Sequence, residues 1–191
     1  SRTVIPAEIP EEKVEKIKYQ DYENYTQRQY SKINENLNIS NVIANDKYTI
    51  IMDQFGTGYS KYKNLQVNRY KETDEAQQGI MFYIKNIRNK NSRNSKNRKY
   101  ASNTKSSKPD KYNLVFAPEM DKIIRVDESI ETITKTIVDT DEPVEVRRLE
   151  LKNTGAIEEI LEITGVIEPI ISDKMQDYAH KAFNNLFLSY E

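Results

Sequence analysis

The residue types that carry out acid–base, metal or nucleophilic chemistry are sparse in this sequence. His180 is the only histidine among the 191 residues, and there is no cysteine. A transition-metal site would therefore need carboxylates around His180, and no such spacing is visible. No G-x-S-x-G motif supports a serine nucleophile paired with this histidine. We therefore expect no metal, no cofactor, no disulfide and no catalytic residue, with His180 hydrogen-bonded or on the surface.

Carboxylates are plentiful, but no pair is singled out for glycosidase chemistry, which needs two positioned acids. Those available include Asp53, Glu128, Asp139 and Asp141. A second group of acids is better explained as the solvent face of a sheet, and consists of Glu158, Glu159, Glu162 and Glu168. The sequence therefore identifies no acid–base pair.

A short turn, Gly56-Thr57-Gly58, is followed by Tyr59 and Tyr62. The turn lacks the length and the lysine of a phosphate-binding P-loop, so a tight turn is the favoured interpretation. We expect any sugar or subunit contact at Tyr59 and Tyr62. Their spacing places them on opposite faces of a regular strand, so the glycines must bend the chain for both to serve one site. The alternative is that one ring packs in the core and the other covers its rim.

Residues 88–111 form a basic segment set among Asn and Ser. Its cationic residues are Arg88, Lys90, Arg93, Lys96, Arg98, Lys99, Lys105, Lys108 and Lys111. Asp110 is its only acid, and Tyr100 and Tyr112 are its only nearby aromatic residues. Because few rings are available to stack on bases, nucleic-acid binding is the less favoured alternative. We expect a flexible loop that joins two strands.

The composition favours an all-β fold with balanced charge. Lys and Arg total 29 against 30 Asp and Glu, which gives no general attraction to nucleic acid or to an anionic membrane. No apolar run reaches the roughly 20 residues of a spanning helix, and the first residues do not form a signal sequence. We expect a soluble protein without membrane insertion, and the absence of cysteine is compatible with a cytoplasmic location. Abundant Ile, Val, Thr and Tyr favour strands.

Residues 1–40 show no sustained apolar periodicity, so we interpret them as an N-terminal arm or linker with a helical turn or two. From residue 41 onward, apolar patterns predict strands at about residues 48–52, 65–70, 80–87, 112–116, 124–126 and 130–138. Many short strands with turns between them predict an antiparallel β-sandwich over residues 41–191.

The apolar residues of 144–151 change phase halfway along, which predicts a β-bulge at Arg147-Arg148 that turns all of them toward the core. These apolar residues are Val144, Val146, Leu149 and Leu151. The turn at residues 152–155 then predicts a hairpin into residues 157–171.

Three stretches together resemble the amino-terminal domain of glycoside hydrolase family 94, formerly glycosyltransferase family 36. The first contains the family's G-G-Y-S turn, the aromatic and basic residues after it, and an R-Y pair, here Gly56, Gly58, Tyr59, Ser60, Tyr62, Lys63, Arg69 and Tyr70. The second, at 112–131, reads YNLVFAPEMDKIIRVDESIE, and the third lies within 144–191 and includes VEVRRLELKNTG and DYAHKAFNNLFLSYE. Within the family, the chain is most similar to the cyclic β-1,2-glucan synthases and β-1,2-oligoglucan phosphorylases. It departs from the family pattern at Phe55, where a small residue is usual, and in the basic segment.

The resemblance implies part of a galactose-mutarotase-like supersandwich, truncated at its C-terminal end, which precedes a catalytic (α/α)-barrel in a longer parent enzyme. That parent would be a glycosyltransferase or glycoside phosphorylase that transfers glucosyl units from a β-glucan to phosphate, or that trims glucans in a cyclising enzyme. This piece would be non-catalytic. It would serve as a scaffold, a subunit contact in a possible homo-oligomer and one wall of the sugar site, with the barrel and a β-glucan oligosaccharide as partners.

The alternative function is a free-standing carbohydrate-binding module that stacks exposed rings of Tyr59 and Tyr62 on sugar. Coplanar, exposed rings favour the module, whereas burial favours the scaffold. A nucleic-acid binder and an independent small hydrolase are the remaining alternatives.

Overall fold

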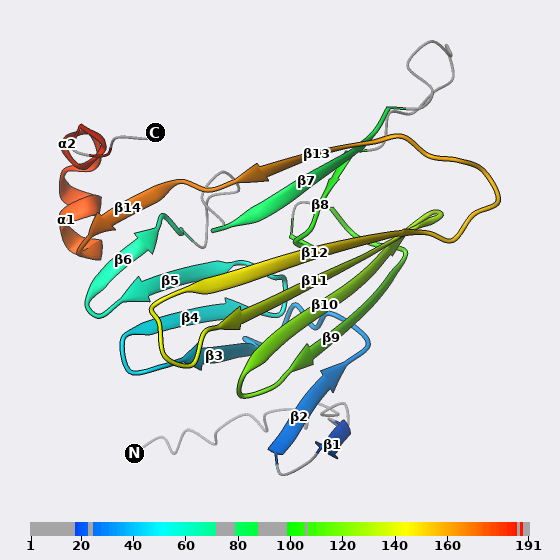
Figure 1. Cartoon of the computed structure of the whole chain (residues 1–191), viewed down its shortest axis with the longest axis horizontal. Helices are drawn as coiled ribbons and strands as arrows, with labels where there is room; N and C mark the ends of the chain where they lie inside the picture. Colours follow the sequence, from blue (N-terminus) through cyan, green and yellow to red (C-terminus); the bar gives the residue numbers. More distant parts are fainter. Residues whose placement is uncertain are drawn as a thin grey trace, which may run out of the picture.

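The computed structural model describes residues 18–22, 25–71, 79–87, 99–105, 107–186 and 188, which form antiparallel sheets followed by short helices. One layer is a six-stranded sheet in the order β1-β2-β9-β10-β11-β12 (Figure 1). Its strands are β1 (Lys18–Tyr22), β2 (Tyr25–Tyr30), β9 (Lys111–Phe116), β10 (Met120–Asp127), β11 (Ile130–Val138) and β12 (Glu145–Asn153).

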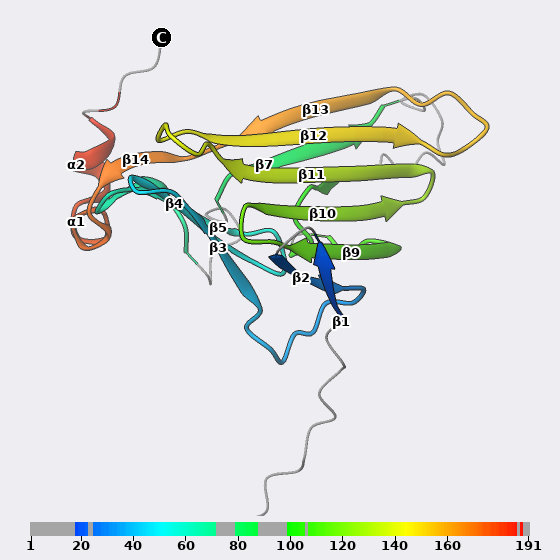
Figure 2. The ribbon, with the colours of Figure 1, turned by 60° about the horizontal axis from the view of Figure 1, so that its bottom comes forward.

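Two smaller sheets form the opposing layer. A five-stranded sheet has the order β14-β6-β5-β4-β3, and a three-stranded sheet has the order β13-β7-β8. Their strands are β3 (Ser40–Ala44), β4 (Tyr48–Asp53), β5 (Gly58–Tyr62), β6 (Leu65–Asn68), β7 (Met81–Asn86), β8 (Lys99–Ala101), β13 (Leu161–Val166) and β14 (Pro169–Ser172). The helices α1 (Lys174–Ala179) and α2 (Lys181–Asn185) follow β14. Figure 2 shows β9 to β12 side by side, with β3 to β5 running in a different direction. The predicted all-β sandwich is confirmed.

The core lies between these layers because alternate residues of the facing strands point inward. On the five-stranded sheet Tyr48, Ile50 and Met52 are buried, and they pack against Leu114, Phe116 and Ile123 of the six-stranded sheet. A second cluster, formed by Ile84, Tyr100 and Ile130, joins the three-stranded sheet to the same large sheet. In the described residues, no helix is long and apolar enough to cross a membrane.

The predicted β-bulge at Arg147-Arg148 is wrong. β12 pairs with β11 residue for residue along its whole length, without a shift in register. Leu149 and Leu151 are half-buried on the inner face, whereas Val144 and Val146 are 48% and 46% exposed. An unbroken strand therefore keeps the two pairs of apolar residues on opposite faces.

At the start of β12, Glu145 and Arg147 point toward the core. The predicted bulge placed Val144 and Val146 on that side. Arg147 Nε lies 2.5 Å from Glu145 Oε1, and Arg147 Nη1 donates to the Ile80 carbonyl at 2.8 Å. The hydroxyls of Tyr48 and Ser60 donate to Glu145 Oε2. Because both charges have several partners, they can lie between the layers, where an unpaired charge would be costly.

The predicted hairpin across residues 152–155 is also wrong, because β13 pairs with β7 in the other layer. The Asn153 side chain accepts from the Gly155 amide at 2.9 Å and donates to the Ile157 carbonyl at 2.7 Å. The Thr154 amide donates to the Ser129 carbonyl at 2.7 Å. These local bonds make a turn, but the chain leaves it by crossing between the layers.

Two further segments differ from their sequence-based expectations. Residues 18–22 and 25–30 form strands, and β2 pairs with β9, so this part of the expected arm extends the large sheet instead of forming helical turns. Within the basic segment, residues 88–98 and Ser106 lie outside the described residues, but Tyr100 to Thr104 are buried and packed. The division of the chain at residue 40 stays a prediction.

The Asp121 carboxyl lies buried between the layers on β10. Its Oδ1 accepts from the Asn41 side chain at 2.7 Å, and Oδ2 has no hydrogen-bond partner among the described residues. Burial raises the pKa of Asp121 to about 7, although Asn41, Arg147 and Arg28 act in the opposite direction. An aspartate in an unfolded chain has a pKa of about 3.9.

The Asp121→Asn variant is therefore expected to have a flatter pH dependence of stability. Between about pH 4 and pH 7 the folded wild type holds a proton at Asp121 that the unfolded chain releases, so this group's contribution to stability falls as pH rises. As the pH rises from about 4 to 7, the free energy of unfolding of the variant should increase relative to that of the wild type by a few kcal/mol, since one pKa unit corresponds to about 1.4 kcal/mol. Urea unfolding at pH 4, 5.5 and 7 measures the difference. The exposed Asp141→Asn is the control, and equal slopes for all three proteins would contradict the expectation.

Candidate functional site

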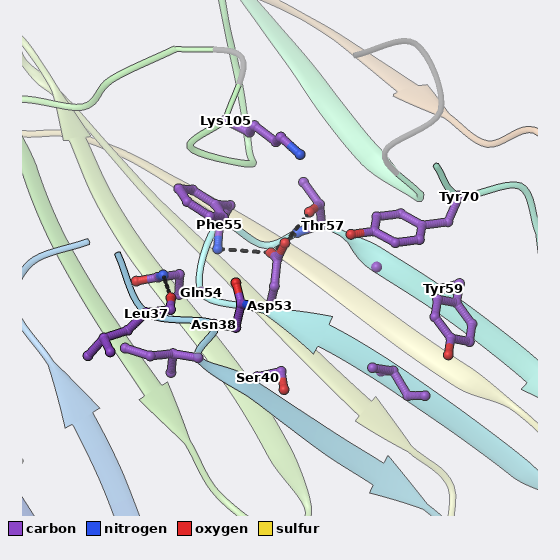
Figure 3. A pocket seen from close by; sticks show the side chains of 13 residues that line it. Leu37, Asn38, Ser40, Asp53, Gln54, Phe55, Thr57, Tyr59, Tyr70 and Lys105 are labelled. Atoms are coloured by element: carbon purple, nitrogen blue, oxygen red, sulfur yellow. Dashed lines mark hydrogen bonds between the residues drawn. The ribbon is translucent and has the colours of Figure 1, made fainter. Parts of the chain in front are cut away.

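A pocket of about 190 Å³ opens on the outer face of the five-stranded sheet, away from the core. It is lined by residues 37–40, by the turn between β4 and β5, and by Tyr59, Tyr70 and Lys105, and we call it the Tyr59 pocket (Figure 3). Figure 3 shows Tyr59 and Tyr70 at one end, with Leu37 and Phe55 toward the other. The pocket thus brings together segments that are distant in the sequence.

The turn between β4 and β5 is held by Asp53. Its Oδ1 accepts from the amides of Phe55 and Thr57, each at 2.9 Å, and its Oδ2 accepts from the Thr57 hydroxyl at 2.6 Å. Burial raises the pKa of Asp53, and the bonds from Thr57 and Phe55 oppose this shift. A carboxylate thus already occupies the amides that a phosphate would need, which confirms a tight turn in place of a phosphate loop.

Tyr59 and Tyr70 form an aromatic pair in this pocket. Their ring centroids lie 5.7 Å apart with planes inclined by 34°, and Lys61 Nζ lies 5.5 Å from the Tyr59 ring centroid. Tyr59 is half-buried, so one part of its ring remains accessible from the pocket. The pair offers aromatic surface next to polar groups.

Tyr62 lies outside the Tyr59 pocket. It packs against the core cluster of Tyr48 and Ile50 from the opposite face of β5, with Lys63 Nζ 5.4 Å from its ring centroid. The strand alternation expected from the spacing of three therefore holds, and the glycines do not turn both rings to one site. Of the two predicted contact residues, the structure places only Tyr59 in the pocket.

The opposite wall is fixed by buried hydrogen bonds. The Gln54 side chain donates to the carbonyls of Asn34 and Leu37 at 2.7 and 2.6 Å, which orders the segment that leads into β3. The Thr104 amide donates to the Phe55 carbonyl at 2.8 Å and so positions the neighbouring Lys105 at the pocket. The Gln54 side chain and one backbone hydrogen bond thus fix this wall.

The other candidate residues lie elsewhere. His180 is exposed between α1 and α2, and Glu128 is exposed in the turn after β10. Asp139 accepts from the amides of Asp141 and Glu142, and these bonds hold the pKa of Asp139 below its usual range. Across the described residues, no group of three or more His, Cys, Asp or Glu side chains could hold a metal.

The four acids expected on a solvent face divide into two pairs. Glu158 and Glu162 are exposed, as expected. Glu159 accepts from the Asn86 side chain at 2.7 Å, and Glu168 accepts from the buried Arg69. Arg69 also donates to both oxygens of Asp177 and thereby joins β6 to α1.

The Tyr59 pocket suits binding more than catalysis. Aromatic surface beside hydrogen-bonding groups is typical of sites for small ligands that have an apolar face and polar edges. Sequence reasoning did not foresee Asn38, Tyr70 or Lys105 in this place. Tyr70 belongs to the R-Y pair of the family motif, whereas nothing local in the sequence marks Asn38 or Lys105.

Comparison with known proteins gives two findings. Residues 23–191 match the model of the family described as Glycosyl hydrolase 94, supersandwich domain. A cyclic beta-(1,2)-glucan synthase, NdvB, of Rhizobium meliloti (strain 1021) is 20% identical over 151 residues, which cover 78% of this chain and 5% of that protein. The chain thus corresponds to a small part of this relative.

Proposed function

Because the chain belongs to the glycosyl hydrolase 94 supersandwich family, we propose that it is the non-catalytic amino-terminal β-sandwich of a longer carbohydrate-active enzyme. That parent is of the β-glucan phosphorylase or cyclic glucan synthase type, with an (α/α)-barrel that carries the chemistry. The sandwich acts as a scaffold and subunit contact, and its Tyr59 pocket forms one wall of the sugar site. A cytoplasmic location and a homo-oligomer stay part of this proposal.

A series of exposed apolar side chains is the observation that carries the scaffold role. It runs from β13 through β14 to the helices and comprises Ile163, Ile167, Ile171, Met175, Tyr178, Phe183 and Leu186, each 49–83% exposed. Apolar surface of this kind marks contact sites with other protein surfaces. We assign the covering of this apolar surface to another domain of the parent enzyme.

The alternative, a free-standing carbohydrate-binding module, needs exposed and coplanar rings at Tyr59 and Tyr62. Both rings are half-buried, and they lie on opposite faces of β5. This arrangement favours a scaffold with one sugar-facing residue.

The substitution Ile171→Lys in the parent enzyme tests the scaffold role. In the 191-residue chain Ile171 is 67% exposed, so the variant should change the free energy of unfolding by less than about 0.5 kcal/mol. In the parent, the same lysine would be buried against the following domain, and an unpaired buried charge costs several kcal/mol. Calorimetry and glucan turnover should therefore show a lower Tm and reduced activity only in the parent.

Val42→Lys on β3 is the matched control, because Val42 is 54% exposed but lies at the far edge of the five-stranded sheet. It should have the same small effect in both proteins. If Ile171→Lys is equally harmless in the parent, the proposed domain contact is incorrect.

A further inference from the structure

A second pocket, of about 730 Å³, adjoins the Tyr59 pocket and shares Phe55 and Lys105 with it. The rest of this pocket is lined by Ser31, Lys32, Ile33, Glu35, Thr104 and residues 107–112. The Tyr112 hydroxyl at this pocket donates to the carbonyl of Gln54, a residue that lines the Tyr59 pocket. The two pockets are thus neighbouring parts of one surface, connected by the hydrogen bond from the Tyr112 side chain to the Gln54 backbone.

Positive charge dominates this second pocket, which we call the lysine pocket. Its charged lining residues are Lys32, Lys105, Lys108, Lys111, Glu35 and Asp110. Lys32, Lys108 and Lys111 make no salt bridge within the described part of the chain. Asp110 accepts from the Glu128 amide at 2.7 Å, so one of the two acids is already hydrogen-bonded. Four lysines against two acids leave a positive field in a concave site, which concentrates anions.

The lining also contains apolar and aromatic surface. Phe55, Tyr112, Ile33 and Pro109 contribute to it, and Lys111 and Tyr112 are adjacent on β9. A volume of about 730 Å³ lies within the usual range for small-molecule sites, roughly 300–1,000 Å³, and greatly exceeds what one inorganic anion fills. The pocket therefore suits an anionic group attached to a larger, partly apolar body.

We propose that the lysine pocket binds a negatively charged substituent, such as a phosphate ester, on a glycan whose neighbouring sugar ring lies in the Tyr59 pocket. This inference rests on the proposed sugar contact at Tyr59 and adds the ligand's charge to it. Lys105 stands between the two pockets and so contacts the junction of sugar and substituent. Lysine binds phosphate as a point charge without demanding one fixed geometry, so mobile side chains suffice.

The test measures binding of four probes to the 191-residue chain by calorimetry. They are a neutral β-1,2-linked gluco-oligosaccharide, the same oligosaccharide with one phosphate monoester, inorganic phosphate and a single-stranded oligonucleotide. At about 0.01 M salt the phosphorylated oligosaccharide should bind about ten-fold more tightly than the neutral one. Near 1 M salt, where the screening length falls to about 3 Å, the difference should largely disappear.

Matched variants show which lysines cause the tighter binding of the phosphorylated oligosaccharide. Lys108→Gln combined with Lys111→Gln should remove the preference for the phosphorylated probe. Lys122→Gln combined with Lys135→Gln makes the same change in charge on the outer face of the large sheet, where these residues pair across β10 and β11. This control variant should retain the preference for the phosphorylated probe. Tyr59→Ala should weaken both oligosaccharides equally, because it removes the shared sugar contact.

Several outcomes would overturn the inference. Equal affinity for the two oligosaccharides at low salt, or equal losses in both double variants, would exclude the lysine pocket. Inorganic phosphate that binds as tightly as the phosphorylated oligosaccharide would make this a phosphate site, and tighter binding of a single-stranded oligonucleotide through the same lysines would make it a nucleic-acid site. If these results occur while Ile171→Lys behaves as expected in the parent, the scaffold role stands and only the glycan inference fails.

Discussion

Replacing Arg125 with methionine is expected to lower the free energy of unfolding by about 3–5 kcal/mol, the usual cost of leaving one partner of a buried ion pair uncompensated. Arg125 is fully buried on β10, and its Nε and Nη2 donate to the two oxygens of Asp127, each at 2.7 Å. Its Nη1 donates to the carbonyls of Ala101 and Asn103 at 2.5 and 2.6 Å. The guanidinium carbon lies 5.1 Å from the Tyr100 ring centroid. Methionine fills part of the space but leaves a buried carboxylate and two carbonyls unpaired.

Thermal and urea unfolding measure this loss, and Tm should fall by roughly 10 °C for a chain of this size. Arg125→Lys should retain some stability, because an ammonium group replaces only part of the forked contact. Arg148→Met is the control, since the Arg148 side chain is 70% exposed and its pair with Glu150 spans 3.1 Å. Such a surface pair contributes about 0–1 kcal/mol. Similar losses in Arg125→Met and Arg148→Met would show that Arg125 does not hold the two layers together.

Arg125 also connects stability with the candidate site. The carbonyls that it binds belong to Ala101 and Asn103, and Lys105, two residues further on, lines the Tyr59 pocket. Thr104 in turn donates to the Phe55 carbonyl. Without Arg125, this segment would lose its attachment to the large sheet, and Lys105 would no longer be held between the two pockets. Ligand affinity should therefore fall in Arg125→Met even at temperatures where the chain is folded.

The strands and their buried residues explain how far the sequence predicts the fold. Alternation at Tyr48–Met52 and Tyr112–Phe116 was sufficient for the strands and the all-β class, because one face of each strand meets the core. It failed at β12, because the inward positions there hold Glu145 and Arg147, whose burial depends on partners from other strands. The burial of Arg125 and the packing of residues 100–104 were not predicted for the same reason. A buried charge can be recognised only when its partners are known.

The candidate site was predictable to a smaller extent. The sequence predicts the glycine-containing turn and names Tyr59 and Tyr62 together as contact residues, but only Tyr59 lines the pocket, because the two side chains lie on opposite faces of β5. The rest of the site comes from residues 37–40, Tyr70 and Lys105, which reach the pocket only through the register of the sheet and the side chain of Gln54. No local sequence pattern predicts that these residues line one pocket, because the pocket is formed by contacts between segments far apart in the chain.

The Gly58→Ala variant is expected to lose more than about 2 kcal/mol of stability and to lose ligand binding at the Tyr59 pocket. A Cβ atom at Gly58 would lie 2.0 Å from the Ile51 carbonyl oxygen and 3.0 Å from the Met52 Cα, both on the paired strand β4. Because these are backbone atoms, the clash can be relieved only by moving β4 and β5 apart. That movement would displace Tyr59, which pairs with Ile51 in the ladder.

Gly165→Ala on β13 separates this steric effect from the general consequences of replacing glycine. Its added Cβ would meet only the Phe82 ring, at 3.7 Å, which is an ordinary contact. That variant should be neutral or more stable by about 0.4–1 kcal/mol, since alanine restricts the unfolded chain. Urea unfolding of both variants, together with oligosaccharide titration of the folded proteins, provides the comparison. If Gly58→Ala is as stable as Gly165→Ala and binds like the wild type, the close approach of β4 and β5 at Gly58 does not shape the pocket.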